Sequence, residues 1–302
     1  MNLQPSALTL DIERISKRVQ DYVELAKLRV VSMVLVTTGV GFYLGSHSGA
    51  LDYLRLLPTL VGTGLAAVGS LALNQVMERD VDAKMRRTRN RPIPDGRIQP
   101  GEALIFGVGT TVIGLLYLSL AVNLLSGLVT AATALSYLLI YTPLKRRTHL
   151  STVVGAAPGA LPPVTGWVAA TNQLSVEAGV LFAILFLWQL PHALAIARLY
   201  RDDYARAGIR LLPVVEPDCR STGRQVVANC VALLVVGMMP AFVGLAGPSY
   251  FMVGLVLGIA YLGYGIAFSL SRTVASARQL LFASLVYLPA LLTAMALDKT
   301  PY

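Results

Sequence analysis

Three oxygen-bearing side chains recur at every fourth position near residue 80. Asn74, Glu78 and Asp82 have this spacing, and in a helix successive members are turned by only about 40°, so all three lie on one face. Asp80 falls on the opposite side. Mg²⁺ binds oxygen ligands and is held through a few protein groups together with substrate phosphates. The row therefore predicts a catalytic metal–phosphate site built from Asn74, Glu78 and Asp82.

Basic residues follow this row directly. Arginines at 86, 87, 89 and 91 supply planar, fork-shaped donors that suit diphosphate oxygens. A second basic group occupies positions 145–147, after a separate apolar block. Two interpretations remain open for both groups: they bind phosphate, or they form solvated, salt-bridged loops that anchor the chain beside a membrane.

A histidine and a pair of acids define a second candidate region. Trp188 lies one turn before His192, and on a continuous helix His192 and Asp203, eleven residues apart, return to nearly the same face. Asp202 is turned by about 100° from Asp203, and Pro191 disturbs the helix nearby. Histidine is a common metal ligand, so this polar face predicts a substrate or iron contact. The alternative is a histidine that only packs or hydrogen-bonds inside a bundle.

Membrane helices must position these residues. Hydrophobic residues make up 55% of the 302-residue chain and charged residues only 14%, which excludes a water-soluble globular protein. The apolar residues form blocks of about 20, the length that crosses a bilayer as a helix, rather than the short alternations of a membrane barrel. We predict an all-α polytopic membrane protein with nine transmembrane helices, at about 28–46, 56–77, 102–121, 123–141, 151–170, 176–199, 225–246, 250–270 and 277–297.

The basic residues predict the orientation of this bundle. With nine spans, 23 of the 25 Lys and Arg fall on one side, and only Arg55 and Lys299 fall on the other. The positive-inside rule makes the first side cytoplasmic. Residues 1–27 are then a cytoplasmic segment, the C-terminus lies outside, and both acidic regions lie toward the cytoplasm. The net charge of +9 follows from this topology and requires no nucleic-acid partner.

Two further features bear on location and cavity. Residues 1–27 contain no apolar stretch typical of a cleaved signal and carry several acidic residues, which favours a bacterial inner membrane over an organelle. The fifth block is rich in glycine and contains Pro158, Pro162 and Pro163. Prolines remove backbone donors and kink a helix, so this block either packs closely against its neighbours or lines an internal cavity.

The motifs together resemble the UbiA-type intramembrane prenyltransferases, within them the branch that acts on heme. The resemblance covers about residues 74–213 in order, and the number of spans agrees beyond them. Its segments are Asn74-(x)3-Glu78-(x)3-Asp82, Met85-Arg-Arg87-Thr-(x)2-Arg91-Pro92, Tyr141-Thr142-(x)2-Lys145-Arg146, Gly159-Ala-(x)-Pro162-Pro163-(x)2-Gly166-Trp167, Trp188-Gln189-(x)-Pro191-His192 and Asp202-Asp203-Tyr204-(x)2-Ala207-Gly208-(x)3-Leu212-Pro213.

The resemblance implies a single domain over 1–302, with nine helices around a central cavity that opens toward the cytoplasm. It implies Mg²⁺ as cofactor, farnesyl diphosphate and heme b as substrates, heme O and diphosphate as products, and a heme A synthase as the pathway partner. The implied roles are first-site metal and diphosphate binding by Asn74, Glu78 and Asp82, second-site binding by Asp202 and the metal ligand Asp203, diphosphate binding by Arg87, Arg91, Lys145 and Arg201, and heme contact by Trp188 and His192.

The sequence departs from the family pattern at two places. Related chains often have Asp where this one has Glu78, and the second motif lacks the Asp-rich spacing of quinone-type relatives, since His192 or Ala193 stands near its first Asp. A transferase for a quinone precursor or a chlorin is therefore one alternative, against which the Trp188–His192 segment argues. A transporter is the other, but its charges would be expected near the bilayer midplane.

Overall fold

A computed structural model describes residues 7–46 and 52–300 of the chain. The described residues form these helices: α1 (Ala7–Ala26), α2 (Leu28–Gly45), α3 (Tyr53–Asp82), α4 (Pro100–Ala121), α5 (Leu124–Leu135), the π-helix η1 (Ser136–Tyr141), α6 (Thr142–Leu144), α7 (Ser151–Ala160), α8 (Pro162–Thr171), α9 (Val176–Leu199), α10 (Arg201–Arg206), α11 (Leu212–Val215), α12 (Arg220–Phe242), α13 (Pro248–Ser271) and α14 (Val274–Leu297).

Nine segments within these residues are long and apolar enough to cross a membrane. The predicted all-α fold and the predicted number of spans are therefore confirmed. The fourth span combines α5, η1 and α6, and the fifth combines α7 and α8. The predicted segment 1–27 lies partly outside the described residues.

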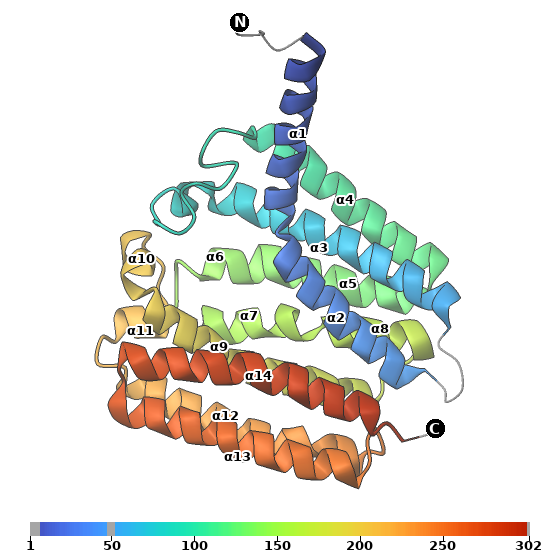
Figure 1. The fold of residues 1–302 in the computed structure, drawn as a ribbon, viewed down its shortest axis with the longest axis vertical. Coiled ribbons are helices and arrows are strands. Elements are labelled where there is room, and N and C mark those ends of the chain that lie inside the picture. The colour runs from blue at the N-terminus through green and yellow to red at the C-terminus, as the bar shows by residue number, and fades with distance from the viewer. Residues whose placement is uncertain (1–6, 47–51, 301–302) are drawn as a thin grey trace, which may run out of the picture.

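The spans run side by side and bring their functional ends together. In Figure 1, α10, α11 and the connection between α3 and α4 gather at one end of the bundle, where α3 and α9 also finish. We call this the pocket end. The helix α1 runs across the direction of the spans, packs against α3 and projects beyond α4 (Figure 1). The apolar blocks predicted no helix here.

The helix α3 is longer than its apolar block. It continues for 30 residues and ends at Asp82, so the row of Asn74, Glu78 and Asp82 is helical throughout. Asp80, predicted for the opposite side, has a side chain that is 83% exposed, whereas that of Asp82 is 1% exposed. The predicted polar face is therefore present and turned inward.

The continuous helix expected from His192 to Asp203 is wrong. The helix α9 ends at Leu199, and Tyr200 leaves the helical conformation before the short α10 begins. The guanidinium of Arg87 lies over the ring of Tyr200, 5.3 Å from its centroid. The contact joins Tyr200 to the connection after α3 at the point where α9 ends. Because the helix ends there, His192 does not share one continuous helix with Asp202 and Asp203.

The fifth span is closely packed, as one of its two interpretations required. It breaks at Leu161, before two consecutive prolines. Glycines on α2 and α8 then face each other's backbone: a Cβ atom at Gly41 would stand 2.0 Å from the carbonyl oxygen of Pro163, and one at Gly166 would stand 1.9 Å from that of Thr38. Small residues permit this approach of two helices within a membrane.

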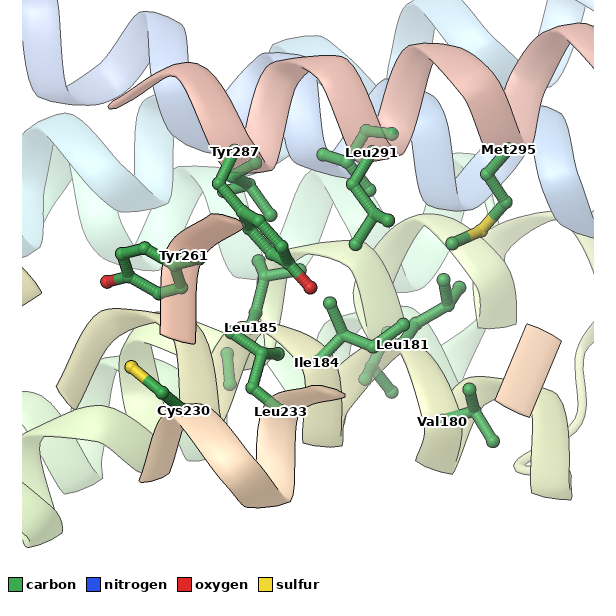
Figure 2. Packing of buried hydrophobic residues seen from close by; sticks show 14 of the residues in the cluster. Val180, Leu181, Ile184, Leu185, Cys230, Leu233, Tyr261, Tyr287, Leu291 and Met295 are labelled. Carbon is green, nitrogen blue, oxygen red and sulfur yellow. The ribbon is translucent and has the colours of Figure 1, made fainter. Parts of the chain in front are cut away.

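The largest buried apolar cluster joins α9, α12, α13 and α14. Figure 2 shows part of it, with Leu181 and Ile184 of α9 facing Leu291 of α14. The rings of Tyr261 and Tyr287 stack with centroids 5.1 Å apart. This cluster fixes α14 against α9 beside the predicted Trp188 and His192.

A smaller cluster fixes the connection that follows α3. Leu25 of α1, Ile93 and Ile98 of this connection, Ala72 and Ala103 are all buried together. Beside them, the Arg97 guanidinium donates to carboxylates of α1, to Asp21 and to Glu24 at 2.8 Å. The arginine-bearing connection is thus bound to both α1 and α3.

Candidate active site

Six of the predicted site residues line one pocket of about 130 Å³ at the pocket end. They come from three parts of the chain: the last turns of α3, the connection after it, and the residue that follows α6. These residues are Asn74, Glu78, Asp82, Arg87, Arg91 and Lys145.

Each carboxylate in the pocket is paired with a cation. Lys145 Nζ lies 2.9 Å from one Glu78 oxygen and 3.2 Å from the other. Arg91 Nη1 lies 2.5 Å from Asp82 Oδ2. A buried charge is costly unless it is paired, and these pairs satisfy that condition. Glu78 and Lys145, and Asp82 and Arg91, therefore neutralise each other in this structure.

A π-helix shapes the wall opposite the acids. Single turns of π-helix often occur at functional sites, and η1 places Tyr137 and Tyr141 along the pocket. Lys145 Nζ lies 4.4 Å from the centre of the Tyr141 ring. The Asn74 amide donates to Thr142 Oγ1 at 3.1 Å, and the Thr142 hydroxyl donates to the Tyr137 carbonyl. This chain of bonds leaves the amide oxygen of Asn74 for another partner.

Lys27 is a pocket residue that the sequence analysis missed. It links α1 to α2 in the left-handed conformation, with φ of 50°, and it lines the pocket with Glu78 and Asp82. Burial, and then the nearby Arg91 cation, lower the pKa of Lys27 to about 7, against the opposing effect of the two carboxylates. A lone lysine before an apolar block carries no signal beyond positive-inside anchoring, so its spacing could not reveal it.

The segment that follows α9 contributes Tyr204, Ile209 and Leu211 to the wall of the pocket. Ala207 and Ile209 pack with Val81 and Met85 at the end of α3. The backbone N–H of Arg210 donates to the Lys145 carbonyl at 3.0 Å. Burial raises the pKa of Tyr204, which keeps its hydroxyl a hydrogen-bond donor.

The acids of this loop do not line the same pocket. Asp203 forms an ion pair with Arg206 within α10, and Asp202 is exposed. Arg201 is also absent from the pocket wall. The structure therefore brings Tyr204 to the first acidic row and leaves its neighbours Arg201, Asp202 and Asp203 beside the pocket.

Trp188 and His192 form a separate polar group between α9 and α14. The two residues lie one helical turn apart, and their rings stack with centroids 5.0 Å apart. His192 Nδ1 lies 2.7 Å from Ser284 Oγ, and Trp188 Nε1 donates to the Ser284 carbonyl at 2.9 Å. Ser284 is fully buried, so both side chains are held by α14 rather than by the acidic row.

The donor set at the pocket fits a hard divalent cation. Across residues 7–46 and 52–300, no three His, Cys, Asp or Glu side chains gather as a closed ligand group. The pocket instead offers two carboxylates, Glu78 and Asp82, and the amide oxygen of Asn74. Mg²⁺ typically uses one or two carboxylates and completes its shell with water and substrate phosphates, so an incomplete protein set is the expected arrangement.

Comparison with known proteins identifies the class. The sequence profile of the UbiA prenyltransferase family matches residues 34–286. The chain therefore belongs to the UbiA prenyltransferase family, and the resemblance noted from its motifs is confirmed.

Individual relatives are more specific. The protoheme IX farnesyltransferase of Solibacter usitatus is 49% identical over 288 residues, which cover 93% of this chain and 99% of that protein. That of Koribacter versatilis is 42% identical and covers 95% of both chains.

Solved structures share the fold at lower identity. The structure described for digeranylgeranylglyceryl phosphate synthase has a TM-score of 0.79 and 16% identity over 93% of this chain and 98% of that one. A UbiA homolog from Archaeoglobus fulgidus bound to GPP and Mg²⁺ has a TM-score of 0.63 and 18% identity, over 91% and 99% of the two chains.

Proposed function

We propose that this protein transfers the farnesyl group of farnesyl diphosphate to a vinyl group of heme b, with addition of water, and releases heme O and diphosphate. The observation that carries the proposal is the 49% identity to a protoheme IX farnesyltransferase over nearly the whole of both chains. The pocket supports its diphosphate half, because two carboxylates and several cations meet there.

The cations of the pocket are proposed to hold the diphosphate. Arg91 and Arg87 supply fork-shaped donors, and Lys145 and Lys27 supply compact positive charges. The Tyr204 hydroxyl can donate one more hydrogen bond. Lys145 stays protonated. Burial lowers its pKa, but the nearby Tyr141 and Glu78 raise it by more, so that the pKa lies above the ordinary value. These donors stabilise the charge that develops on the leaving diphosphate as the allylic bond breaks.

Glu78, Asp82 and Asn74 are proposed to hold Mg²⁺, which supplies Lewis-acid stabilisation of the leaving group. Loading then requires an exchange of partners. For this, Lys145 would leave Glu78 and Arg91 would leave Asp82, so that both cations could donate to diphosphate oxygens and both carboxylates would be free to hold the metal. Each of the two carboxylates would face a cation both before and after loading, so neither would be buried without a counterion.

The remaining predicted roles are kept as proposals. Asp203 can serve a second metal after releasing Arg206, with Asp202 and Arg201 beside it. Trp188 and His192 are proposed to contact the heme. The Ser284 hydroxyl donates to the Leu281 carbonyl and so accepts from Nδ1–H of His192, which fixes the ring and leaves the Nε2 lone pair for the substrate. A heme A synthase is the proposed recipient of the product.

Replacing His192 by alanine is expected to weaken heme b binding by about tenfold, a loss of the size seen when a ligand or its supporting bond is removed. Titration of heme b into purified protein, followed at the Soret band, measures this affinity. His149 offers a matched control, since it lies in the connection between α6 and α7. Unchanged heme affinity in the His192→Ala variant would exclude this role.

The pKa of Lys27 predicts a pH dependence of diphosphate binding. Lys27 is charged below about pH 7 and neutral above it, and only the charged form attracts the anion. Affinity for inorganic diphosphate with Mg²⁺ should therefore fall as pH rises from about 6 to about 8.5, by up to about tenfold per unit above the pKa. Calorimetry on wild type and Lys27→Gln separates this change from titration of the ligand itself. Parallel pH profiles for the two proteins would contradict the prediction.

The protein is an integral membrane protein of the UbiA family, and we propose a bacterial inner membrane as its location. The excess of Lys and Arg at the pocket end supports a cytoplasmic N-terminus and active site, with the C-terminus outside.

The test of the proposed function uses a bacterium that lacks its own heme O synthase. The chain is expressed there, and extracted hemes are separated by chromatography and weighed by mass spectrometry. The expected product has the mass of heme b plus a hydroxyfarnesyl group and is absent with an Asp82→Ala variant. Only heme b, from protein shown to be inserted and folded, would overturn heme as the acceptor and favour a quinone precursor or chlorin. Release of diphosphate distinguishes a transferase from the transporter alternative, because a transporter would release none.

A further inference from the structure

The helix α1 presents three different faces. Positions 18, 21 and 25 share one of them, which is docked on the bundle. Arg18 Nη2 lies 2.6 Å from Glu102 of α4, Asp21 is bound by Arg97, and Leu25 is fully buried. Positions 17, 20 and 24 form a second face of exposed polar side chains. The first face of α1 therefore packs on the bundle and the second is polar, which leaves the third face without an assigned partner.

The third face is apolar and open. Ile15, Val19 and Val23 are 65%, 57% and 46% exposed. Together with Leu28 of α2 and Phe106 of α4, they line an open groove of about 520 Å³. Such a contiguous apolar surface is uncommon on the water-facing side of a protein and indicates an interaction.

The groove is continuous with a surface that must face lipid. Leu28 begins the first span, and further along that span Met33 and Val36 are 66% and 58% exposed. Lys27, which joins α1 to α2, lines the pocket. In Figure 1, α1 runs across the direction of the spans, as a helix lying in the plane of a membrane surface would. Its polar face, with Lys17 and Gln20, is then turned toward water.

We propose that α1 is an interfacial helix, and that its groove takes acyl chains of the phospholipids in the leaflet at the pocket end. An amphipathic helix of this kind lies with its apolar side sunk to the boundary between headgroups and chains. Lipid fits the groove better than a protein partner, because the groove adjoins exposed apolar side chains of a transmembrane helix, Leu28, Met33 and Val36. The seated helix ends at Ala26, directly before Lys27 in the pocket.

The test places a nitroxide label on each of two faces of α1 in vesicles of phosphatidylethanolamine and phosphatidylglycerol. Cys219 and Cys230, both buried, are replaced by alanine, and single cysteines are introduced as Val19→Cys and, as the matched control, Lys17→Cys. Collision rates with oxygen, which enters lipid, and with a water-soluble nickel chelate are measured by electron spin resonance. At residue 19 oxygen should dominate by several-fold, and at residue 17 the chelate should dominate.

Two other results would overturn the proposal. Equal access of the nickel chelate to both labels would place α1 in water. A label at residue 19 that neither reagent reaches would mean that protein fills the groove, as in contact with a second copy of the chain. The measurement requires only inserted, folded protein, so it stands apart from the success or failure of the proposed transferase reaction.

Discussion

Replacing Asp82 by asparagine is expected to lower kcat for farnesyl transfer by about 10³-fold, the loss seen when one group that stabilises transition-state charge is removed. Asparagine keeps the shape of the side chain but removes a charge that is 1% exposed and bound by Arg91. The proposed metal site would lose one of its two carboxylates. Purified protein, farnesyl diphosphate and heme b, with product measured by mass spectrometry, provide the rate.

The matched control for this variant lies two residues away. Asp80→Asn removes the same charge from the opposite face of α3, where the side chain is 83% exposed, so its kcat should stay within about twofold, as is usual for surface changes. The backbone oxygen of residue 82 still accepts from Thr88 in both proteins, which preserves the end of the helix. Equal activity of Asp82→Asn and wild type, at equal melting temperature, would remove Asp82 from the site.

Replacing Gly41 by alanine is expected to destabilise the fold by about 3 kcal/mol, at the upper end of ordinary overpacking. The added Cβ would stand 2.0 Å from the carbonyl oxygen of Pro163 and 2.8 Å from its Cα. Backbone atoms of a proline cannot turn aside as a flexible side chain can. The helices α2 and α8 must therefore separate, and thermal unfolding in detergent should show a clear fall in Tm.

Gly39 provides the control on the same helix. A Cβ atom there would have its nearest neighbour, Leu60 Cδ2, at 3.9 Å, an ordinary contact. Alanine also favours helix more than glycine does, by about 1 kcal/mol, so Gly39→Ala should leave Tm unchanged or raise it. If both variants melt together, close packing of α2 on α8 is not what limits stability.

Features that depend on local periodicity could be predicted from the sequence. The face shared by Asn74, Glu78 and Asp82 follows from 3.6 residues per turn, and the spans follow from the length of apolar blocks. The face that Trp188 and His192 share, one turn apart, is also local. Each of these needs only neighbours within a few turns of one helix.

Features that depend on tertiary packing could not be predicted. The pairing of Lys145 with Glu78 joins residues 67 positions apart. Lys27 reaches the pocket at the junction of α1 and α2, and α1 is held by Arg97, which binds Glu24 from 73 positions away. The break at Tyr200 likewise arises beside Arg87 from a distant connection, so the expected shared face of His192 and Asp203 was wrong. The single domain and the individual site roles stay predictions.

The paired charges of the pocket also determine which ions it excludes. A lone Mg²⁺ would have to displace Lys145 or Arg91 and leave that cation without a counterion, and an inorganic phosphate that drew either cation away would leave its carboxylate without one. Removing one partner of a buried pair costs about 3–5 kcal/mol. A ligand that brings metal and diphosphate together avoids both losses. We therefore expect the free protein to bind the complex of Mg²⁺ with diphosphate in preference to either ion alone. The resting enzyme is then selective before its organic substrate is recognised.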